Sequence, residues 1–313
     1  MNLYKKTISL VVPCFNEEGN VEAIYQLIKT ELDPLVNFEL IFVDDGSSDQ
    51  TLLRIIQIGQ QDSRVRYITL SRNFGHQNAL KAGLDYAKGD AVISLDADLQ
   101  HPPRLIKEFI EKWQQGYDVI YSVRKDGNEI GLFKRLSSKL FYRFINLFSD
   151  TTIQEGAADF RLLDRKVVNV IKALPENYLF IRGLTSWVGF KQIGIEYKAE
   201  KRFSGQSKYS LKRMIHFASS GITSFSTKPL KVSIYLGFTI AIISFIYGLY
   251  AIFEAVFTSN VIQGWTSVIV SVLFIGGIQL IMIGILGEYL GKLFMENKRR
   301  PNYVIKETNL EGK

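Results

Sequence analysis

The chain has 313 residues, a formal net charge of +7, 22% charged residues, three histidines and a single cysteine. One cysteine excludes an intrachain disulfide and a cysteine-rich zinc site, and the histidines show no ligand-like spacing. The length suits one substantial domain and a smaller part. Because the mean hydropathy is slightly positive despite the charge, we expect the apolar residues to be concentrated in particular segments.

The chain starts with a polar segment, Met1–Lys6, and the next apolar run, Ile8–Val12, is too short for the apolar core of a signal peptide. We therefore expect the large domain to stay in the cytoplasm.

Apolar runs then alternate with segments of helical spacing up to about residue 125. We expect strands at 8–12, 38–43, 65–70, 91–95 and 119–123, and helices at 16–32, 49–58, 77–87 and 102–115. Apolar strands that alternate with helices are typical of an α/β fold with a parallel sheet covered on both faces. Such sheets bind ligands at the carboxyl ends of their strands. Asp44-Asp45 and Asp96-Asp98 both fall at such ends and can meet in one cleft.

Two later segments mix apolar residues at helical spacing with basic residues. At about 132–148, Phe133, Leu140 and Phe144 alternate with lysines and arginines. A basic amphipathic helix suits the membrane interface, and a helix packed on the core with one wet face is the alternative. Residues 210–227 form a second candidate, which leads into the next part of the chain.

Two segments carry no charge, Val232–Phe253 and Thr266–Gly287, and each is 22 residues long. Since a helix of about 20 apolar residues crosses a bilayer, we expect two transmembrane helices rather than two buried core helices. Basic residues flank the pair, whereas the connection holds only Glu254 as a charge, so both ends should be cytoplasmic. The basic flanks favour an anionic membrane over nucleic acid as partner.

The second span has a glycine-rich face, formed by Gly276, Gly277, Gly284, Gly287 and Gly291. Small residues allow helices to pack closely, within or between chains, so a homo-oligomer is left open. The expected organisation is a catalytic domain at 1–209, a juxtamembrane helix at 210–230, a hairpin at 231–290 and a cytoplasmic tail at 291–313. We expect this tail to be polar and loosely ordered from Pro301.

The segment Ser94–Pro103 places two carboxylates, Asp96 and Asp98, directly after an apolar strand. Residues two apart in a strand point to the same side, and Gln100 adds an amide oxygen. Such oxygens suit Mg²⁺, which also keeps substrate phosphates in its shell. A solvated turn with a helix cap is the alternative.

Three further polar segments follow strands: Val12–Glu18, Val43–Thr51 and Ser71–Gly75. In this order and at these spacings, the four segments resemble family 2 glycosyltransferases of the GT-A fold, over roughly residues 8–209. The resemblance implies a Rossmann-like, mainly parallel sheet with helices on both faces.

The resemblance also implies site residues and a cofactor. The implied nucleotide-sugar site comprises Pro13 and Glu17 beside the base and ribose, Asp45 on the base or ribose, and Asp96 near the ribose and donor. The implied ligands of Mg²⁺ or Mn²⁺ are Asp96, Asp98 and Gln100. Carboxylates beside a diphosphate need a cation between them, and that cation stabilises the leaving nucleoside diphosphate.

Two later segments narrow the resemblance. Glu155–Arg161 resembles the acceptor-side carboxylate motif of polyprenyl-phosphate glycosyltransferases, and Arg202–Tyr209 resembles their loop over the phosphates. With the two C-terminal spans, the chain resembles bacterial bactoprenol glucosyltransferases of the GtrB type, with dolichol-phosphate mannose synthase a close relative. The Gln-x-x-Arg-Trp segment of processive polysaccharide synthases is absent from the sequence.

The acceptor chemistry follows from the second pKa of a phosphate monoester, which is about 6. A lipid phosphate is therefore already an anionic nucleophile at neutral pH, and Asp159 would position it or take a residual proton. The candidates for holding phosphates are Arg124, Arg161, Arg202, Ser204, Ser207 and Lys208. Arg124 rests only on its place after the fifth strand, where a surface arginine is the alternative.

We therefore expect an inverting, metal-dependent glycosyltransferase of the cytoplasmic membrane. It would move one sugar, by resemblance glucose from UDP-glucose, to undecaprenyl phosphate for modification of cell-surface glycans. GDP-mannose, UDP-N-acetylglucosamine and UDP-galactose are alternative donors. A membrane-anchored nucleotide-sugar-binding protein without turnover is an alternative of another class. A channel is disfavoured because the spans hold no charge.

Overall fold

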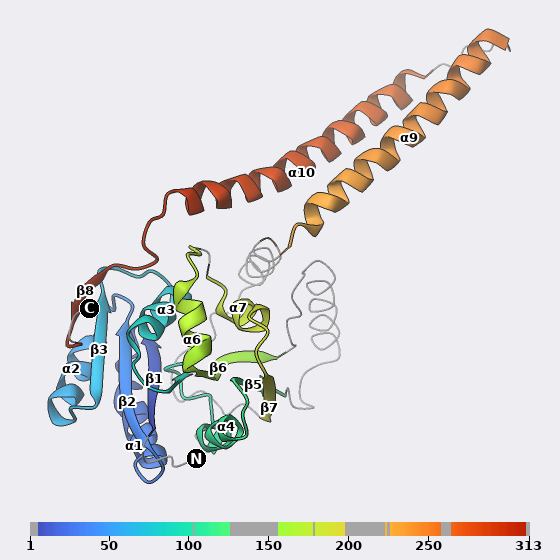
Figure 1. Ribbon diagram of the computed structural model, residues 1–313. Coiled ribbons are helices and arrows are strands. Elements are labelled where there is room, and N and C mark those ends of the chain that lie inside the picture. The colour runs from blue at the N-terminus through green and yellow to red at the C-terminus, as the bar shows by residue number, and fades with distance from the viewer. Residues whose placement is uncertain are drawn as a thin grey trace.

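The structure is a computed structural model that describes residues 6–102, 104–125, 156–177, 179–197, 223, 226–257 and 264–310. Figure 1 shows an α/β domain from which two long helices project side by side. The amphipathic helix expected at about 132–148 lies outside the described residues, as does most of the segment 210–230.

The described residues form one sheet of eight strands in the order β7-β5-β6-β4-β1-β2-β3-β8. The strands are β1 (Thr7–Cys14), β2 (Asn37–Asp44), β3 (Val65–Leu70), β4 (Ala91–Ser94), β5 (Val119–Arg124), β6 (Ala157–Asp164), β7 (Gln192–Tyr197) and β8 (Ile305–Thr308). Parallel pairing joins β1 to β2 and β4, β2 to β3, and β5 to β7. The five strands expected in the first part of the chain and the mainly parallel α/β sheet are confirmed.

Two strands run antiparallel to their neighbours and were not predicted. β6 lies between β4 and β5 and is antiparallel to both, while β8 pairs antiparallel with β3 at the edge of the sheet. The prediction of a loosely ordered tail from Pro301 is therefore wrong for β8. The physical reason is that an edge strand presents unpaired backbone groups, which β8 satisfies. The backbone N–H of Ser71 likewise donates to the Val304 carbonyl at 2.8 Å.

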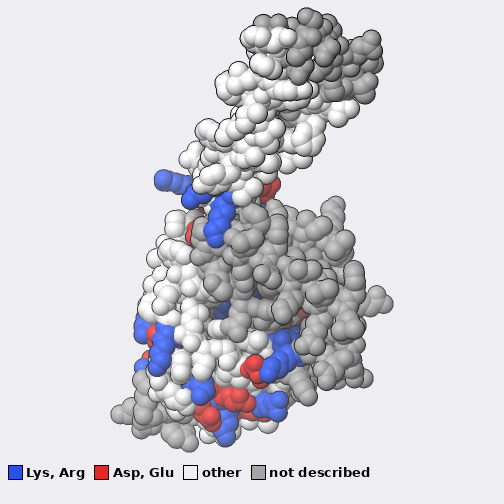
Figure 2. Space-filling view, turned by 90° about the vertical axis from the view of Figure 1, so that its right-hand side faces the viewer, with Lys and Arg blue, Asp and Glu red and all other residues white. Residues whose placement is uncertain are grey.

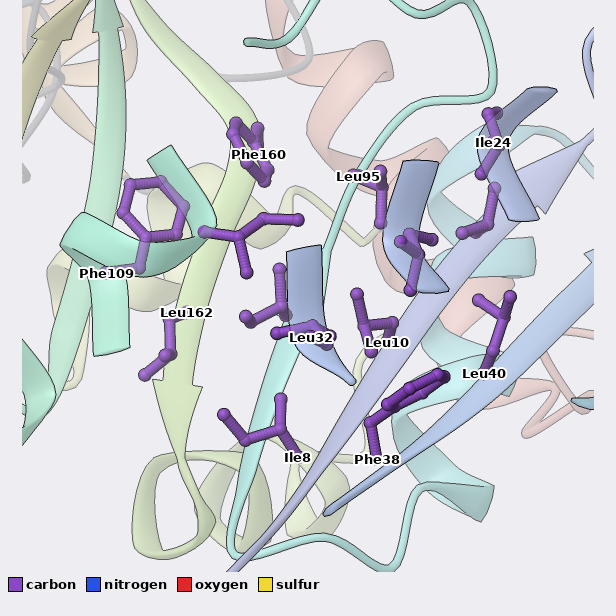
Figure 3. Packing of buried hydrophobic residues seen from close by; sticks show 14 of the residues in the cluster. Ile8, Leu10, Ile24, Leu32, Phe38, Leu40, Leu95, Phe109, Phe160 and Leu162 are labelled. Atoms are coloured by element: carbon purple, nitrogen blue, oxygen red, sulfur yellow. The ribbon is translucent and has the colours of Figure 1, made fainter. Parts of the chain in front are cut away.

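Helices cover both faces of the sheet, as expected. One core cluster includes residues of α1 (Val21–Leu32), α2 (Thr51–Gln61) and α4 (Arg104–Gln114), and the other includes residues of α3 (His76–Tyr86), α6 (Arg165–Ala173) and α7 (Ile181–Trp187). Along β1, Leu10 and Val12 join the first cluster and Val11 the second, because strand side chains alternate between faces. Figure 3 shows Leu10 and Phe160 among the side chains of the first cluster. Burial of each such side chain stabilises the fold by about 1.5–3 kcal/mol.

The projecting helices are α9 (Lys228–Phe257) and α10 (Trp265–Asn297). Each contains a stretch long and apolar enough to cross a membrane, and no residue of these stretches is buried inside the protein. Phe238 and Phe245, for example, are 67% and 68% exposed. In Figure 2 the described surface of the pair is white along most of its length, and charged side chains gather near its base. So much exposed apolar surface requires an apolar surrounding. The helices are longer than the uncharged segments Val232–Phe253 and Thr266–Gly287, since polar residues that flank these segments are also helical.

The end of α10 is fastened to the α/β domain. The Glu296 carboxylate accepts hydrogen bonds from the backbone N–H and the side-chain amide of Asn177 at 2.9 and 3.0 Å. Asn302 Nδ2 donates to the Glu176 carbonyl at 2.9 Å, and the Tyr303 hydroxyl bonds to Asp85 Oδ2 at 2.9 Å. These contacts hold the segment between α10 and β8 against the α/β domain, so that β8 begins at the edge of the sheet.

Candidate active site

The acidic strand ends converge on one edge of the sheet. Asp45 follows β2, while Asp96 and Asp98 follow β4. β6 runs antiparallel to β4, so Asp159 near its start lies beside the end of β4. The Ser94 hydroxyl on β4 donates to the Asp159 carbonyl at 2.6 Å and ties the two strands together. The expected meeting of separate acidic segments is therefore present in the fold.

Asp45 braces the loop after β3. Its carboxylate accepts hydrogen bonds from the backbone N–H groups of Phe74 at 2.7 Å and Gly75 at 2.9 Å, and the residue is only 3% exposed. Burial raises the pKa of Asp45 more than these two hydrogen bonds lower it. Gly46 has a φ of +70°, and a Cβ there would lie 2.6 Å from the Arg72 carbonyl carbon, so only glycine lets the two loops touch. The contact of Asp45 with a base or ribose stays a prediction.

Pro13 and Glu17 lie on the neighbouring loop. Pro13 is buried at the end of β1 beside Val43 of β2. The Glu17 carboxylate accepts a hydrogen bond from Asn20 Nδ2 at 2.6 Å, and the Glu17 backbone N–H donates to the Thr51 hydroxyl at 2.8 Å. The loop after β1 is thereby fastened to the start of α2. The contact of Pro13 and Glu17 with a nucleotide stays a prediction.

Asp96 lies between two histidines. His76 Nε2 is 2.8 Å from Asp96 Oδ1, and His101 Nε2 is 3.4 Å from Oδ2, while His101 Nδ1 is 3.2 Å from the Tyr197 hydroxyl. Burial alone would raise the pKa of Asp96, but the hydrogen bonds from His101 and His76 hold it well below its usual value. Burial would lower the pKa of His76, yet the contact with Asp96 raises it to about 9. The side chains of His76 and Asp96 remain 42% and 34% exposed, so a ligand can reach them.

Asp98 and Gln100 lie on the turn that follows. Leu99 between them has a left-handed φ of 57°, and the Gln100 backbone N–H donates to Asp98 Oδ1 at 3.2 Å. Both side chains are partly exposed. In the part of the chain that the structure describes, no three His, Cys, Asp or Glu side chains form a metal-binding group by themselves. Two carboxylates and one amide fit a hard divalent cation whose shell substrate phosphates and water complete.

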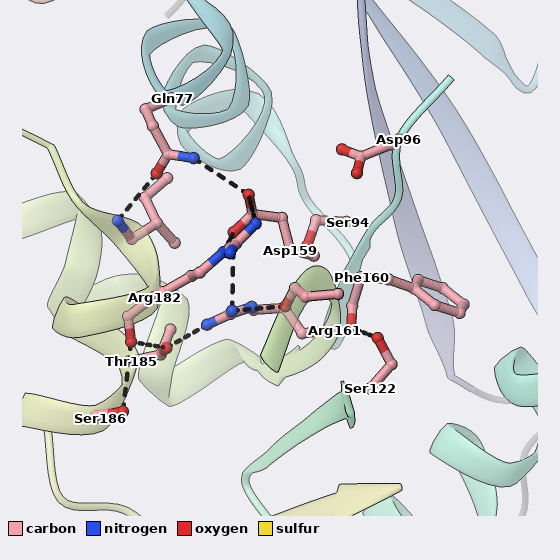
Figure 4. A network of polar contacts seen from close by, with 12 residues as sticks. Gln77, Ser94, Asp96, Ser122, Asp159, Phe160, Arg161, Arg182, Thr185 and Ser186 are labelled. Atoms are coloured by element: carbon pink, nitrogen blue, oxygen red, sulfur yellow. Dashed lines mark hydrogen bonds and ion pairs between the residues drawn. The ribbon is translucent and has the colours of Figure 1, made fainter. Parts of the chain in front are cut away.

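Asp159 has a different environment (Figure 4). It is 6% exposed, and the Arg182 guanidinium grips it with two hydrogen bonds of 2.7 and 2.8 Å. Arg161 Nη2 lies 3.8 Å from the same carboxylate. Burial raises the pKa of Asp159, but the charge and hydrogen bonds of Arg182 outweigh it, so the pKa is lowered. The buried carboxylate is therefore an anion held by a two-pronged arginine fork.

The predicted phosphate-binding residues divide into three groups. Arg161 is 2% exposed. It donates hydrogen bonds to the Thr185 hydroxyl and, at 2.8 Å, to the Ala158 carbonyl, so its guanidinium is bound to groups of the protein itself. Arg124 is exposed at the end of β5, and its backbone N–H donates to the Gly156 carbonyl at 2.9 Å. The remaining four, Arg202, Ser204, Ser207 and Lys208, lie outside the described residues. A phosphate-binding role for each stays a prediction.

Sequence reasoning missed four residues that hold the two carboxylates: His76, Gln77, His101 and Arg182. The histidines lack zinc-like spacing, yet His76 directly follows the Ser71–Gly75 segment and His101 directly follows Gln100. Arg182 lies 23 positions beyond Asp159 on another element, where no spacing rule connects them. For His76, Gln77 and His101, the only available signal in the sequence is that they lie next to a recognised motif.

A Rossmann-like sheet with acidic turns at its carboxyl edge defines a class of nucleotide-dependent enzymes. Residues 9–171 match the model of the family "Glycosyl transferase family 2", and residues 228–293 match "GtrB C-terminal hairpin". The chain belongs to glycosyltransferase family 2 and is a glycosyltransferase, which confirms the resemblance drawn from the motifs.

The relatives match this chain over almost its whole length. It is 45% identical to the bactoprenol glucosyl transferase of Shigella phage SfV, over 96% of this chain and 98% of that protein. It is 44% identical to the uncharacterized glycosyltransferase YkcC of Bacillus subtilis, over 96% of this chain and 93% of that protein. Among solved structures, a glucosyl-3-phosphoglycerate synthase from Mycobacterium tuberculosis is similar with a TM-score of 0.47 and 21% identity, over 70% of this chain and 77% of that one.

Proposed function

We propose that this protein transfers one sugar from a nucleotide-sugar to a polyprenyl phosphate, with undecaprenyl phosphate as the acceptor, at the cytoplasmic face of the membrane. The observation that carries the proposal is the pair of unlike carboxylate sites on neighbouring strands. Asp96 and Asp98 lie on a partly exposed turn after β4, and Asp159 lies buried on β6, paired with Arg182 of α7. Relatives named as bactoprenol glucosyl transferases support a polyprenyl-phosphate acceptor.

On the donor side, we propose that Asp98, Gln100 and Asp96 hold Mg²⁺ or Mn²⁺. When bound, the cation would neutralise the donor diphosphate and stabilise the charge that develops on the departing nucleoside diphosphate. Pro13, Glu17 and Asp45 would form the wall on which the base and ribose rest. The relatives' names favour glucose, and UDP-glucose is accordingly the proposed donor.

On the acceptor side, an oxygen of the lipid phosphate attacks the anomeric carbon while the bond from that carbon to the diphosphate breaks. The nucleoside diphosphate leaves with the bonding electrons, and attack from the opposite side inverts the configuration, so an α-linked donor gives a β-linked product. The attacking phosphate is mostly dianionic near neutral pH. Asp159, held as an anion by Arg182, would orient the acceptor and take any residual proton.

The hairpin gives this reaction its location. α9 and α10 are long and apolar enough to cross a membrane and present exposed apolar surface. The lysine and arginines at 298–300 follow α10 directly. Basic residues flank spans on the cytoplasmic side, so we propose that both ends of the hairpin and the catalytic domain share that side. The division into a domain at 1–209, a hairpin at 231–290 and flanking segments belongs to this proposal.

The test uses the full chain in lipid nanodiscs with undecaprenyl phosphate, Mn²⁺ or Mg²⁺, and a panel of labelled UDP- and GDP-sugars. We expect label in the lipid fraction with one donor, UDP-glucose, and none after chelation of the cation. No label with any donor would contradict the proposal. Donor binding without transfer would instead favour the nucleotide-sugar-binding protein without turnover.

A further inference from the structure

We propose that Gln77 and Arg182 are positioning residues that fix the orientation of Asp159 and connect it, through the first turn of α3, to Asp96. The inference rests on the proposed function and deepens it, because it says how the donor and acceptor sides are kept in register. Neither residue belongs to the sequence segments on which the resemblance was drawn, and both contact the Asp159 carboxylate.

Gln77 uses both ends of its amide, and its Nε2 also lies 3.4 Å from Nδ1 of the neighbouring His76. Gln77 Nε2 donates to Asp159 Oδ2 at 3.4 Å, and Gln77 Oε1 accepts a hydrogen bond from the Ile181 backbone N–H at 3.0 Å. Ile181 is the first residue of α7, where backbone N–H groups have no partner within the helix. The two contacts fix the amide orientation, since a flipped amide would satisfy neither. Gln77 thereby holds both Asp159 and the start of the helix that carries Arg182.

Arg182 supplies the charge and the geometry. Its Nε and Nη2 reach the two oxygens of Asp159 at 2.7 and 2.8 Å, a fork that lysine cannot reproduce. Among the residues that the structure describes, Arg161 from β6, at 3.8 Å, and His76 from α3 also face Asp159. A buried carboxylate without such partners would be strongly destabilised. The fork therefore decides which way the carboxylate points, and Figure 4 shows Gln77 and Arg182 approaching it from two helices.

The same turn of α3 reaches the donor side. His76, the neighbour of Gln77 in the chain, contacts Asp96 at 2.8 Å. The two residues before it, Phe74 and Gly75, are held through their backbone N–H groups by Asp45. Residues 74–77 thus contact three carboxylates from three strand ends, and Gln77 is the member that extends the connection to Asp159.

The experiment compares Gln77→Leu, Arg182→Lys and Arg182→Gln with a matched control, Gln192→Leu. Gln192 also fastens α7, because its Nε2 donates to the Thr185 carbonyl at 2.7 Å, but it does not contact Asp159. The full-length variants are assayed for Mn²⁺-dependent binding of UDP and for kcat and KM with undecaprenyl phosphate across pH. Melting temperatures are recorded for each variant.

We expect Arg182→Gln to lower kcat by roughly 100-fold and Gln77→Leu by roughly 10-fold, with Mn²⁺-dependent UDP binding unchanged. In Arg182→Gln, loss of the positive charge should raise the pKa of Asp159. The fall of kcat on the acidic side of its pH profile should therefore begin at a higher pH. Arg182→Lys keeps the charge, and the acidic side of its profile should stay in place while kcat recovers only in part. Gln192→Leu should match the wild type in both kcat and pH profile.

Two outcomes would overturn the inference. The first is a kcat within twofold of the wild type, with an unshifted pH profile, in all three variants. The second is a loss of kcat in Gln192→Leu as large as the loss in those variants. A readout without transfer separates the inference from the proposed function. In a double-variant cycle, the melting-temperature losses of Arg182→Gln and Asp159→Asn should be non-additive, and those of Gln192→Leu and Asp159→Asn additive. If the wild type transfers no sugar, the proposed function fails, and additive losses for the first pair would contradict the positioning role independently.

Discussion

The two sides of the site are built from different structural elements. The proposed donor side consists of loops that leave neighbouring parallel strands, and its carboxylates Asp96 and Asp98 keep partial exposure. The proposed acceptor side is a single carboxylate, Asp159, buried on an antiparallel strand and paired with Arg182. The partly exposed carboxylates contact histidines or the turn's own backbone, whereas the buried one is held by an arginine fork.

Because the two carboxylate sites are built differently, we expect mutations in them to impair different steps of the reaction. A mutation on the proposed donor side should weaken binding of the nucleotide diphosphate and thereby reduce every later step. An acceptor-side change should leave the nucleotide bound and stop only the transfer. Three predictions test that separation, and a fourth uses the C-terminal segment as a region that should affect neither.

The largest effect is expected for Asp98→Ala. Loss of a proposed ligand of the cation removes several kcal/mol of charge stabilisation, so transfer should fall roughly 1,000-fold. Mn²⁺-dependent UDP binding, measured by calorimetry, should weaken in parallel. Asp33→Ala serves as the control, because Asp33 is a largely exposed carboxylate that pairs with Arg64 away from these strand ends. Near-normal transfer by Asp98→Ala would remove the metal role.

A smaller but more selective effect is expected for Asp159→Asn. The variant loses the anion that orients the acceptor, and transfer should fall roughly 100-fold. UDP binding with Mn²⁺ should stay within about twofold of the wild type, since no donor-side group is changed. Assays of binding and transfer on the same preparation give the comparison. A parallel loss of both would show that the two sides are not separable.

The carboxylates of Asp159 and Asp45 should change the stability of the fold with pH in opposite directions. The pKa of Asp159 is lowered, so its ion pair stabilises the protein above the unfolded pKa of about 4 and loses that contribution as pH falls through the folded pKa. The pKa of Asp45 is raised, so its contribution is greatest below pH 4 and falls as pH rises. Chemical unfolding should show Asp159→Asn costing about 3 kcal/mol at pH 7 and less near pH 3.5. An equal cost at both pH values would contradict the ion-pair account.

The smallest effect is expected for Tyr303→Phe in the segment after α10. The variant loses the hydrogen bond to Asp85 and about 1 kcal/mol of stability, with transfer unchanged. Burial, with Asp85 nearby, raises the pKa of Tyr303. The wild type therefore loses stability above about pH 10, where the unfolded tyrosine ionises, and the variant lacks that loss. Urea unfolding at pH 7 and pH 10.5 distinguishes the two. Loss of transfer would show that the C-terminal segment does affect the site.

The sequence predicted the half of the fold that depends on local pattern. β1 to β5 are apolar runs of strand length separated by helical spacing, so their existence and the parallel core were predictable. β6 was missed because its position between β4 and β5 is decided by tertiary pairing, although Asp159 and Arg161 alternate with Phe160 and Leu162. β8 is four residues long and lies behind the hairpin, where no local pattern distinguishes it from a tail.

The site divides in the same way. The donor-side turn was visible because Asp96, Asp98 and Gln100 are close in sequence and follow a strand. Asp159 was found only through resemblance, and its partners Gln77 and Arg182 come from two other elements, 82 and 23 positions away. Such partners become neighbours only when the chain has folded, so their role could not be read from spacing.

The most direct test of the account measures UDP binding with Mn²⁺ and sugar transfer to undecaprenyl phosphate in the wild type, Asp98→Ala and Asp159→Asn, side by side. The account predicts that Asp98→Ala loses both activities and that Asp159→Asn keeps binding and loses transfer. Retention of transfer by either variant, or loss of binding in Asp159→Asn, would contradict it.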